Sequence, residues 1–259
     1  MKRGSAPLGP ALLTGASSGI GAALAERLAA RGYHVVLAAR RLPELEALAS
    51  RLRSAGHSAE ALELDVSRLD ETADRVRALD ARLGGLELVV ANAGVPGTLV
   101  RASQQPLEAA RRVMDINFHG ALATLLPPVS GMLNRGRGKL VGVTSLAARI
   151  ALPAAADYGT SKAALTFFLE SLAADVASGG LQVTIVQPGF VRTAMTARNR
   201  FTMPFIMDAE AAATIVDQAI EAGERYCQFP KALHLAASCG RALPHRLREL
   251  LLARNSPVR

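Results

Sequence analysis

Short apolar runs alternate with amphipathic stretches along the first two thirds of the chain. The apolar runs predict buried strands at residues 11–14, 34–39, 59–64, 86–91, 139–144 and 181–186. The stretches between them have helical spacing and predict helices at 19–31, 43–55, 68–83, 106–133 and 157–178. This alternation predicts an α/β fold, a doubly wound, Rossmann-type parallel sheet with helices on both faces. No low-complexity linker divides residues 1–259, so we expect a single domain.

The alternation ends near residue 187, and residues 190–208 form a long excursion before a helix expected to begin around Ala209. Excursions of this length in compact domains often act as lids or binding loops, so we interpret 190–208 as a variable substrate lid. Its apolar residues suit a hydrophobic substrate, although packing of the lid onto the core explains them equally well. They are Met195, Phe201, Met203, Phe205, Ile206 and Met207.

A glycine-rich turn, TGASSGIG at 14–21, follows the first predicted strand. Gly15, Gly19 and Gly21 let the backbone turn sharply and approach a diphosphate, which the free N–H groups of the next helix attract. The spacing differs from the common G-x-G-x-x-G pattern. An ordinary strand-to-helix turn is the alternative, but the position in the first strand–helix–strand unit favours a dinucleotide site.

The second predicted strand ends in AARR, residues 38–41. Proteins that select NAD usually place an acidic residue here to hold the ribose 2′-hydroxyl. This chain instead has Ala39 followed by Arg40 and Arg41, and guanidinium groups pair with a 2′-phosphate. The pattern favours NADP(H) as the cofactor, and the alternative is a solvated arginine pair at the start of a surface helix.

The segment YGTSK, residues 158–162, sets Tyr158 four places ahead of Lys162, which puts both side chains on one helix face. A phenol has a pKa of about 10, and a nearby ammonium favours the phenolate and lowers that pKa. With 3 tyrosines in the 259 residues, the chance expectation of such a pair is about 0.05. The pair therefore suggests proton transfer to or from an oxygen.

Several ordered motifs resemble the short-chain dehydrogenase/reductase family over about residues 10 to 195. TGASSGIG resembles the family's cofactor turn, LDV (64–66) its adenine contact through Asp65, and NAG (92–94) its segment beside the adenine-side ribose; PGFVRT (188–193) follows the sixth strand. The resemblance implies four catalytic residues, Asn117, Ser145, Tyr158 and Lys162. It also implies cofactor contacts from Gly15, Ser17, Ser18, Gly19, Ile20, Gly21, Arg40, Arg41, Asp65, Val66, Asn92, Ala93, Gly94, Tyr158, Lys162, Pro188, Gly189, Val191 and Thr193.

The chemistry of these residues suits reduction of a carbonyl, whose oxygen gains negative charge as hydride arrives at carbon. Ser145 can donate a hydrogen bond to that oxygen and Tyr158 can supply the proton. Lys162 can hold the nicotinamide ribose and lower the pKa of Tyr158. By resemblance, Asn117 holds a water that links Lys162 to solvent. Taken singly, the serine also fits a strand-end cap, the asparagine a polar helix residue and the lysine a surface position.

Two features depart from the family pattern or lie outside it. Ala91 stands where many relatives have a second asparagine before Asn92. The segment from about 224 to 259 falls where the family is variable, and it supplies +5 of the +8 net charge. Its basic residues are Arg225, Lys231, Arg241, Arg246, Arg248, Arg254 and Arg259.

The high isoelectric point of about 10.3 raises nucleic acid or an anionic membrane as a partner. No basic stretch is interleaved with aromatic residues, so we expect no nucleic-acid binding. For the tail 231–254, one hypothesis is a weak peripheral contact of an amphipathic segment with an anionic membrane. The alternative, which we favour, is a helix packed on the domain or on a partner subunit.

Hydrophobic residues make up 50% of the chain, which is enough for a large core, yet no apolar run is long enough to cross a bilayer. Two positive charges at the N-terminus resemble the start of a signal peptide, but Pro7, Gly9 and Pro10 interrupt any apolar segment. We therefore predict a cytoplasmic protein, in which Cys227 and Cys239 are expected to be free thiols. No spacing typical of a metal site is present.

We therefore predict an NADP(H)-dependent oxidoreductase that interconverts a carbonyl and an alcohol, with a hydrophobic ketone or aldehyde as the expected substrate. By resemblance it forms a homodimer or homotetramer through helices 106–133 and 157–178. The second helix has an apolar stripe that suits either the core or an interface: Leu165, Phe168, Leu169, Leu172 and Val176. The alternatives are an NADP(H)-binding sensor without turnover and a sugar-nucleotide epimerase or dehydratase, which shares Tyr-x-x-x-Lys but usually has a larger C-terminal domain.

Overall fold

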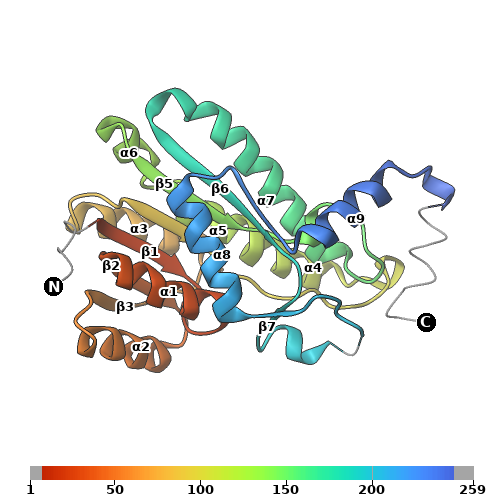
Figure 1. The fold of residues 1–259 in the computed structure, drawn as a ribbon, viewed down its shortest axis with the longest axis horizontal. Helices are drawn as coiled ribbons and strands as arrows, with labels where there is room; N and C mark the ends of the chain where they lie inside the picture. Colours follow the sequence, from red (N-terminus) through yellow and green to blue (C-terminus); the bar gives the residue numbers. More distant parts are fainter. Residues whose placement is uncertain (1–7, 200, 248–259) are drawn as a thin grey trace.

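A seven-stranded parallel sheet forms the centre of the computed structural model, which describes residues 8–199 and 201–247 (Figure 1). The strand order is β3-β2-β1-β4-β5-β6-β9, and every neighbouring pair is parallel. This is the predicted doubly wound fold. The strands are β1 (Gly9–Thr14), β2 (Tyr33–Ala39), β3 (Ala59–Glu63), β4 (Leu88–Ala91), β5 (Gly138–Val143), β6 (Leu181–Pro188) and β9 (Tyr226–Phe229).

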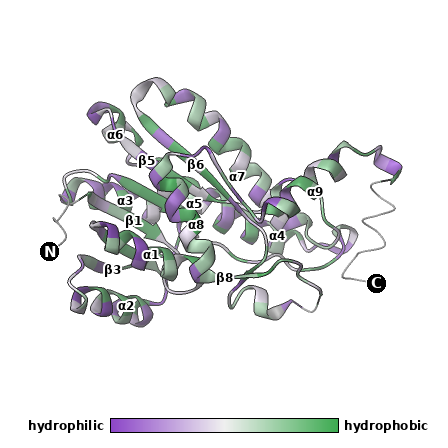
Figure 2. Ribbon diagram, viewed as in Figure 1, coloured by the Kyte–Doolittle hydropathy of each residue, from purple (hydrophilic) through white to green (hydrophobic). Residues whose placement is uncertain are grey.

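The central strands are apolar along their whole length because both of their faces are covered. Leu12 of β1 pairs in register with Val36 of β2 and Val89 of β4, and all three side chains are fully buried. Figure 2 shows the hydrophobic colour concentrated on these strands, while hydrophilic colour lies on the outer helices. Continuous apolar runs, in place of strict alternation, are what a parallel sheet buried on both faces requires.

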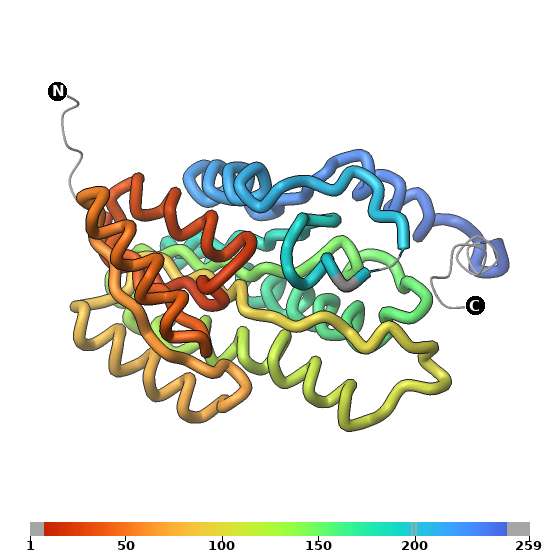
Figure 3. The backbone as a smooth tube through the Cα atoms, turned by 90° about the horizontal axis from the view of Figure 1, so that it is seen from below, coloured from red at the N-terminus to blue at the C-terminus, as the bar shows by residue number. Residues whose placement is uncertain are grey.

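Helices cover both faces of the sheet and create two hydrophobic cores (Figure 3). One core lies under α1, α2 and α8, and the other under α3, α5 and α7. α4 packs beside α7, α6 beside β5 and α9 beside β9. The helices are α1 (Gly19–Arg31), α2 (Leu42–Ser54), α3 (Leu69–Arg82), α4 (Leu107–Met114), α5 (Gly120–Leu125), α6 (Val129–Arg135), α7 (Ala156–Asp175), α8 (Ala209–Ala222) and α9 (Lys231–Ala242).

The apolar stripe of α7 serves the core. Leu165, Leu169, Leu172 and Val176 are buried in the second core, and Phe168 packs against it half-buried. Of the two roles that the sequence allowed for the stripe, core and interface, these positions support the core.

The predicted helix over 106–133 is interrupted. It consists of α4, a π-helical stretch at Asp115–His119, α5 and α6. α5 ends at Leu125, just before Pro127 and Pro128, which cannot donate the backbone hydrogen bonds that a continuous helix needs. The prediction of one long helix was therefore wrong, although the segment is helical on both sides of the break.

The prediction that strand–helix alternation ends near residue 187 was also wrong, because β9 extends the sheet beyond β6. β9 is a four-residue edge strand in which exposed Tyr226 and half-buried Gln228 alternate with buried Cys227 and Phe229. So short and polar a run has no strong strand signal. α8 begins at Ala209, as expected.

The excursion 190–208 is closed at its base by two short parallel strands, β7 (Val191–Arg192) and β8 (Met207–Asp208). Between them the chain contains a short 3₁₀ helix at Thr196–Arg198. Phe201 packs edge-on against Phe190 with ring centroids 6.0 Å apart, whereas the Phe205 side chain is 63% exposed. The apolar residues of the excursion therefore divide between packing and exposure.

α9 packs on the domain through buried His234 and Ala237, and the His234 imidazole donates from Nε2 to the carbonyl oxygen of Gln187 at 2.8 Å. The basic residues Arg248, Arg254 and Arg259, and Pro7 at the N-terminus, lie outside the described residues. Cys227 is a buried free thiol and Cys239 an exposed one. Within 8–199 and 201–247, no helix has the length and apolarity needed to cross a membrane.

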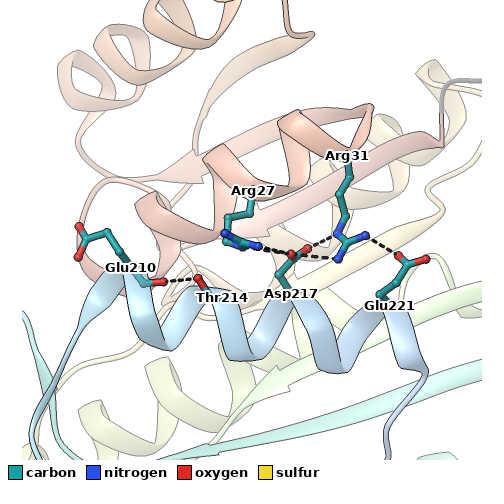
Figure 4. Close-up of polar contacts among 6 residues, drawn as sticks. All are labelled: Arg27, Arg31, Glu210, Thr214, Asp217 and Glu221. Carbon is teal, nitrogen blue, oxygen red and sulfur yellow. Dashed lines mark hydrogen bonds and ion pairs between the residues drawn. The ribbon is translucent and has the colours of Figure 1, made fainter. Parts of the chain in front are cut away.

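A buried carboxylate joins the first helix of the fold to α8 (Figure 4). Asp217 of α8 is 2% exposed and accepts hydrogen bonds from Arg27 at 3.0 Å and from Arg31 at 3.1 Å, both on α1. Arg31 also pairs with Glu221 at 3.3 Å, one helical turn further along α8. Because Asp217 is buried and both guanidinium groups are only partly exposed, this cluster is the main polar connection that we identify between α1 and α8.

We expect Asp217→Asn to lower the free energy of unfolding by about 2 kcal/mol, between the values for exposed and fully buried ion pairs. The physical reason is that two arginines lose the anion that they share. For a domain of this size the melting temperature falls by roughly 4–8 °C, which calorimetry measures. Asp74→Asn, in an exposed pair with Arg77 on α3, serves as the control with little expected change. Equal melting temperatures for both variants contradict a stabilising role for the cluster.

Candidate active site

The glycine turn between β1 and α1 approaches the end of β4 closely. Gly15 has φ +68, and a β-carbon there would lie 2.9 Å from the Ala93 backbone. A β-carbon on Gly21 would meet the carbonyl oxygen of Gly15 and lie 2.6 Å from the Asn92 amide. Only glycine fits at these two places, so the turn is tight and its backbone lies exposed to a ligand at the start of α1.

Asn92 links the two strand ends that frame this turn. Its Nδ2 donates to the carbonyl oxygen of Thr14 at 2.9 Å and to that of Gly15 at 3.3 Å. The backbone N–H groups of Asn92 and Ala93 donate to the Thr14 hydroxyl at 3.1 and 3.2 Å. The side chain of Asn92 therefore holds the turn itself, while the residue also lines the cavity below.

Two arginines stand at the end of β2 in different surroundings. Arg41 donates to the hydroxyls of Ser17 at 2.9 Å and Ser18 at 3.1 Å in the glycine turn, and it pairs with Glu44 at 3.2 Å. The charge of Arg40 acts instead on Asp65 at the end of the next strand. Both guanidinium groups line the cavity and add positive charge beside the turn.

Asp65 is held in place by Ser67, which donates to its Oδ1 from the backbone at 3.1 Å and from the hydroxyl at 2.8 Å. Partial burial raises the pKa of this carboxyl, but the Ser67 hydrogen bonds and the charges of Arg40 and Arg68 outweigh it, so the net pKa is lowered. Asp65 is therefore ionised at neutral pH.

One cavity of about 460 Å³ runs along the carboxyl edge of the sheet from Arg41 to Lys162. All the residues expected to contact a cofactor line it, whereas Asn117 and Ser145 do not. The site residues that sequence reasoning missed come from the same connections and from the base of the excursion. These additional lining residues are Ala39, Leu64, Val95, Pro96, Ile116, Val143, Thr144, Ala194 and Thr196, and Met195 of the predicted lid lines the cavity as well.

Thr196 is the most consequential of the missed residues because it organises the start of the excursion. Its hydroxyl donates to the carbonyl oxygen of Val191 at 2.6 Å and accepts from the backbone N–H of Thr193 at 3.0 Å. The segment TAMT (193–196) contains the needed signal, because a threonine hydroxyl can bond the backbone a few residues away.

Tyr158 and Lys162 lie on one face of α7, one turn apart, at the inner end of the cavity. The Lys162 ammonium is 5.9 Å from the centre of the Tyr158 ring and donates to the carbonyl oxygen of Val143 at 2.9 Å. Lys162 is 4% exposed, and this burial lowers its pKa from 10.5 to about 8. A buried ammonium with one hydrogen bond has two further N–H groups for a ligand.

The pKa of Tyr158 is raised above 10, since burial disfavours the phenolate. The Ser145 hydroxyl interacts with the phenol and acts in the opposite direction, but more weakly. We expected Lys162 to lower the pKa of Tyr158. Burial raises that pKa instead, so Tyr158 holds its proton at neutral pH.

Ser145 lies two residues beyond β5 and begins a short 3₁₀ helix, Leu146–Ala148. Its Oγ accepts a hydrogen bond from the backbone N–H of Ala147 at 3.1 Å, so it does cap this turn. The cap leaves the hydroxyl proton available, and the same hydroxyl reaches Tyr158. The capping and site interpretations of Ser145 are therefore compatible.

Asn117 is fully buried in the π-helical stretch Asp115–His119. Its Oδ1 accepts from the backbone N–H of Val95 at 2.8 Å, and its Nδ2 donates to the Val95 carbonyl oxygen at 3.0 Å and to the Ser161 hydroxyl at 3.1 Å. Isolated π-helical turns occur frequently at functional sites. Here the turn carries Asn117 between the segment after β4 and helix α7.

Fold and site together define a Rossmann-type α/β protein with a tyrosine–lysine pair beside a glycine turn. A family model described as short chain dehydrogenase matches residues 10–203. The chain belongs to this family, the short-chain dehydrogenases/reductases, which are oxidoreductases.

Among its relatives, an uncharacterized oxidoreductase of Myxococcus xanthus is 46% identical over 237 residues, which cover 92% of this chain and 93% of that protein. An 11-beta-hydroxysteroid dehydrogenase-like protein of Arabidopsis thaliana is 34% identical, covering 85% and 72%. The solved short-chain dehydrogenase from Sphingobium yanoikuyae, in complex with NADPH, superimposes with a TM-score of 0.79 at 28% identity, covering 96% of each chain.

The buried ammonium predicts a pH-dependent stability that Lys162→Met removes. Between about pH 8 and pH 10 the unfolded chain keeps the Lys162 proton (pKa 10.5) that the folded chain loses (pKa about 8). The unfolded state then binds more protons, so rising pH stabilises wild type relative to Lys162→Met by about 2 kcal/mol. Urea unfolding at both pH values measures this. Exposed Lys231→Met is the control, and a stability difference independent of pH contradicts the prediction.

Proposed function

We propose that the protein is an NADP(H)-dependent oxidoreductase that interconverts a carbonyl and an alcohol, and that it reduces a hydrophobic ketone or aldehyde. The observation that carries the proposal is that Tyr158 and Lys162 line the same cavity as the glycine turn, and that the Ser145 hydroxyl interacts with the Tyr158 phenol. The glycine turn would hold the diphosphate of a dinucleotide, and Tyr158 and Lys162 would lie on the nicotinamide side of the site.

The lining residues fit NADP(H). The Gly15–Gly21 turn offers backbone N–H groups to the diphosphate, and Arg40 and Arg41 offer guanidinium groups to a 2′-phosphate. An acidic residue at position 39 would favour NAD, but the residue there is alanine. Support also comes from the Sphingobium yanoikuyae enzyme and the actinorhodin polyketide ketoreductase, both solved with NADPH.

In this proposal the bound cofactor supplies the hydride, and the protein's own residues handle the proton and the developing charge. Tyr158, whose raised pKa keeps it protonated, donates its proton to the carbonyl oxygen. The Ser145 hydroxyl donates a hydrogen bond to the same oxygen. The Lys162 ammonium holds the nicotinamide ribose with the N–H groups left after its bond to Val143.

Asn117 has a specific place in this proposal. The family resemblance assigns it a water that links Lys162 to solvent. In the structure its side-chain oxygen and nitrogen already bond Val95 and Ser161. The Asn117 side chain therefore joins Val95 to Ser161, the residue before Lys162. Both Nδ2 hydrogens are used in these bonds, whereas Oδ1 has one lone pair left that can accept a hydrogen bond from a water.

The substrate class rests on the apolar character of the excursion 190–208, which we propose as the lid. Met195 lines the cavity, and Phe205 is 63% exposed on the segment that follows. Methionine side chains accommodate varied shapes. These features support a hydrophobic ketone or aldehyde.

We further propose a homo-oligomer and a cytoplasmic location. Leu107 of α4 and Phe167 of α7 are 74% and 73% exposed on two helices that pack side by side, which supports a subunit contact there. A peripheral membrane contact of the tail remains the weaker hypothesis, because α9 packs on β9 through its buried face.

Tyr158→Phe is expected to lower kcat for carbonyl reduction by about 10²–10⁴-fold, because the proton donor is removed. The dissociation constant for NADPH is expected to change less than about threefold, since the ring remains. Loss of NADPH absorbance against aldehydes, ketones and quinones measures kcat, and fluorescence titration measures binding. Tyr226→Phe, which removes an exposed phenol bonded to Glu170, is the control. If wild type and Tyr158→Phe bind NADPH but are equally inactive on the whole panel, the sensor alternative replaces this proposal.

Arg40→Ala is expected to weaken NADPH binding by about 10–100-fold, the loss of one charge-assisted bond to a phosphate. NADH binding is expected to change less than about threefold because NADH has no 2′-phosphate. Fluorescence titration with both cofactors measures the ratio. Arg75→Ala on α3, which removes a guanidinium paired with Glu71, is the control for net charge. Equal effects of Arg40→Ala on NADPH and NADH would refute the cofactor assignment.

A further inference from the structure

Asp157, directly before Tyr158, is a buried carboxylate that the chemistry above does not use. It is 6% exposed and lies in the first turn of α7. Its Oδ2 accepts hydrogen bonds from the Thr98 backbone N–H at 2.9 Å, the Thr98 hydroxyl at 3.1 Å and Gln105 Nε2 at 3.2 Å. Its Oδ1 accepts from the Tyr158 backbone N–H at 2.7 Å. The Asp157 carboxylate thus joins the first turn of α7 to the connection between β4 and α4.

The two oxygens face different partners. Oδ1 binds the helix that carries Tyr158, and Oδ2 binds the connection between β4 and α4, to which Thr98 and Gln105 belong. The Thr98 hydroxyl also lies 2.9 Å from Gln105 Oε1, which closes the cluster. The Thr98 hydroxyl has a single proton, which it shares between Gln105 Oε1 and Asp157 Oδ2. The unshared donors to the carboxylate are the Thr98 N–H and Gln105 Nε2 on Oδ2 and the Tyr158 N–H on Oδ1.

The connection held in this way lies directly against Tyr158. A β-carbon on Gly97 would be 3.0 Å from the Tyr158 β-carbon and would collide with the Asp157 carboxylate. Val95 and Pro96, just before it, line the same cavity as Tyr158. Residues 95–98 therefore run beside Tyr158, and Val95 and Pro96 form part of the wall of the cavity that Tyr158 lines.

The wall is followed by a strained residue. Leu99 has φ +55, a left-handed conformation that is unfavourable for a leucine. Such conformations persist where surrounding contacts hold the backbone in place. The two hydrogen bonds from Thr98 to Asp157 are contacts of this kind, one residue away.

We propose that Asp157 is a positioning residue that holds residues 95–98 against Tyr158 and so sets which carbonyl compounds reach the phenol. The specificity part rests on the proposed function of Tyr158, and the positioning part rests on the contacts alone. Asp157 acts through the wall and does not touch the reacting atoms.

Asp157→Asn tests the proposal with almost no change in size. The amide has one acceptor oxygen, so its NH₂ group must face either the Thr98 and Gln105 donors or the Tyr158 N–H, and at least one attachment is lost. Thr98→Val is a milder second variant, because it removes the hydroxyl and keeps the backbone donor. Asp175→Asn is the matched control, since Asp175 is exposed at the other end of α7.

The first measurement is hydrogen exchange of the Thr98 and Tyr158 backbone amides in the full-length protein. We expect at least one of them to exchange about tenfold faster in Asp157→Asn and at the wild-type rate in Asp175→Asn, since loss of a net hydrogen bond of this kind changes a local equilibrium by about a factor of ten. If neither amide changes in Asp157→Asn, the positioning role is overturned. This measurement needs no substrate, so it tests the positioning role of Asp157 even if the proposed function is wrong.

The second measurement is the kinetics with NADPH and ketones graded in size from acetone through cyclohexanone to acetophenone. For the best ketone we expect KM to rise about tenfold in Asp157→Asn and about threefold in Thr98→Val, with kcat within threefold and its pH profile unchanged. The differences in kcat/KM among the ketones are expected to become smaller in Asp157→Asn. A general loss of folding would instead lower kcat equally for every ketone and leave KM alone. Faster exchange with KM and preference unchanged would overturn the specificity role, whereas a wild type inactive on every ketone would count against the proposed function itself.

Discussion

Parallel pairing of the strands is the constraint on which the site depends. Because all the paired strands of the sheet run in one direction, the chain leaves β1, β4, β5 and β6 at the same edge. The glycine turn, the NAG segment, Ser145 and the PGFVRT segment lie at or within two residues of the ends of those strands. Residues as far apart in the sequence as Gly15 and Thr196 therefore line one cavity. The two cores on the faces of the sheet fix the strands, and hence the spacing between these groups.

Local strain is distributed among the connections that leave this edge. Within the described residues, the non-glycine residues with positive φ are Leu99 (55°), Ala154 (59°) and Phe205 (55°). They lie in the connections after β4, β5 and β6, one in each. Strain of this kind costs of order 1–3 kcal/mol per residue and persists where neighbouring contacts hold the backbone. The rigid sheet thus supports three connections that each contain one unfavourable residue.

The sequence predicted the fold class, and the residues that it indicated for cofactor contact line one cavity, because both depend on local signals. Buried parallel strands need continuous apolar runs, and a tight turn needs glycine at fixed places, as at Gly15 and Gly21. β9 and the π-helical turn at Asp115–His119 were missed because a short polar edge strand and a single π-helical turn have weak patterns. The raised pKa of Tyr158 comes from burial of the phenol, which only the packed structure reveals. Asp157 gave no signal at all, because its partners lie 59 and 52 residues away.

The pairing of β7 with β8 has a consequence for how this protein can change over time. Val191 and Met207 are neighbours in register, and the Met207 N–H donates to the Phe190 carbonyl oxygen at 3.1 Å, so the excursion is tied at its base. Lengthening a surface loop between fixed ends costs little, about 0.6 kcal/mol for each doubling. Insertions and deletions at 194–206 therefore leave the sheet and the tyrosine–lysine pair in place. One framework can acquire differently shaped entrances by changes in this stretch alone.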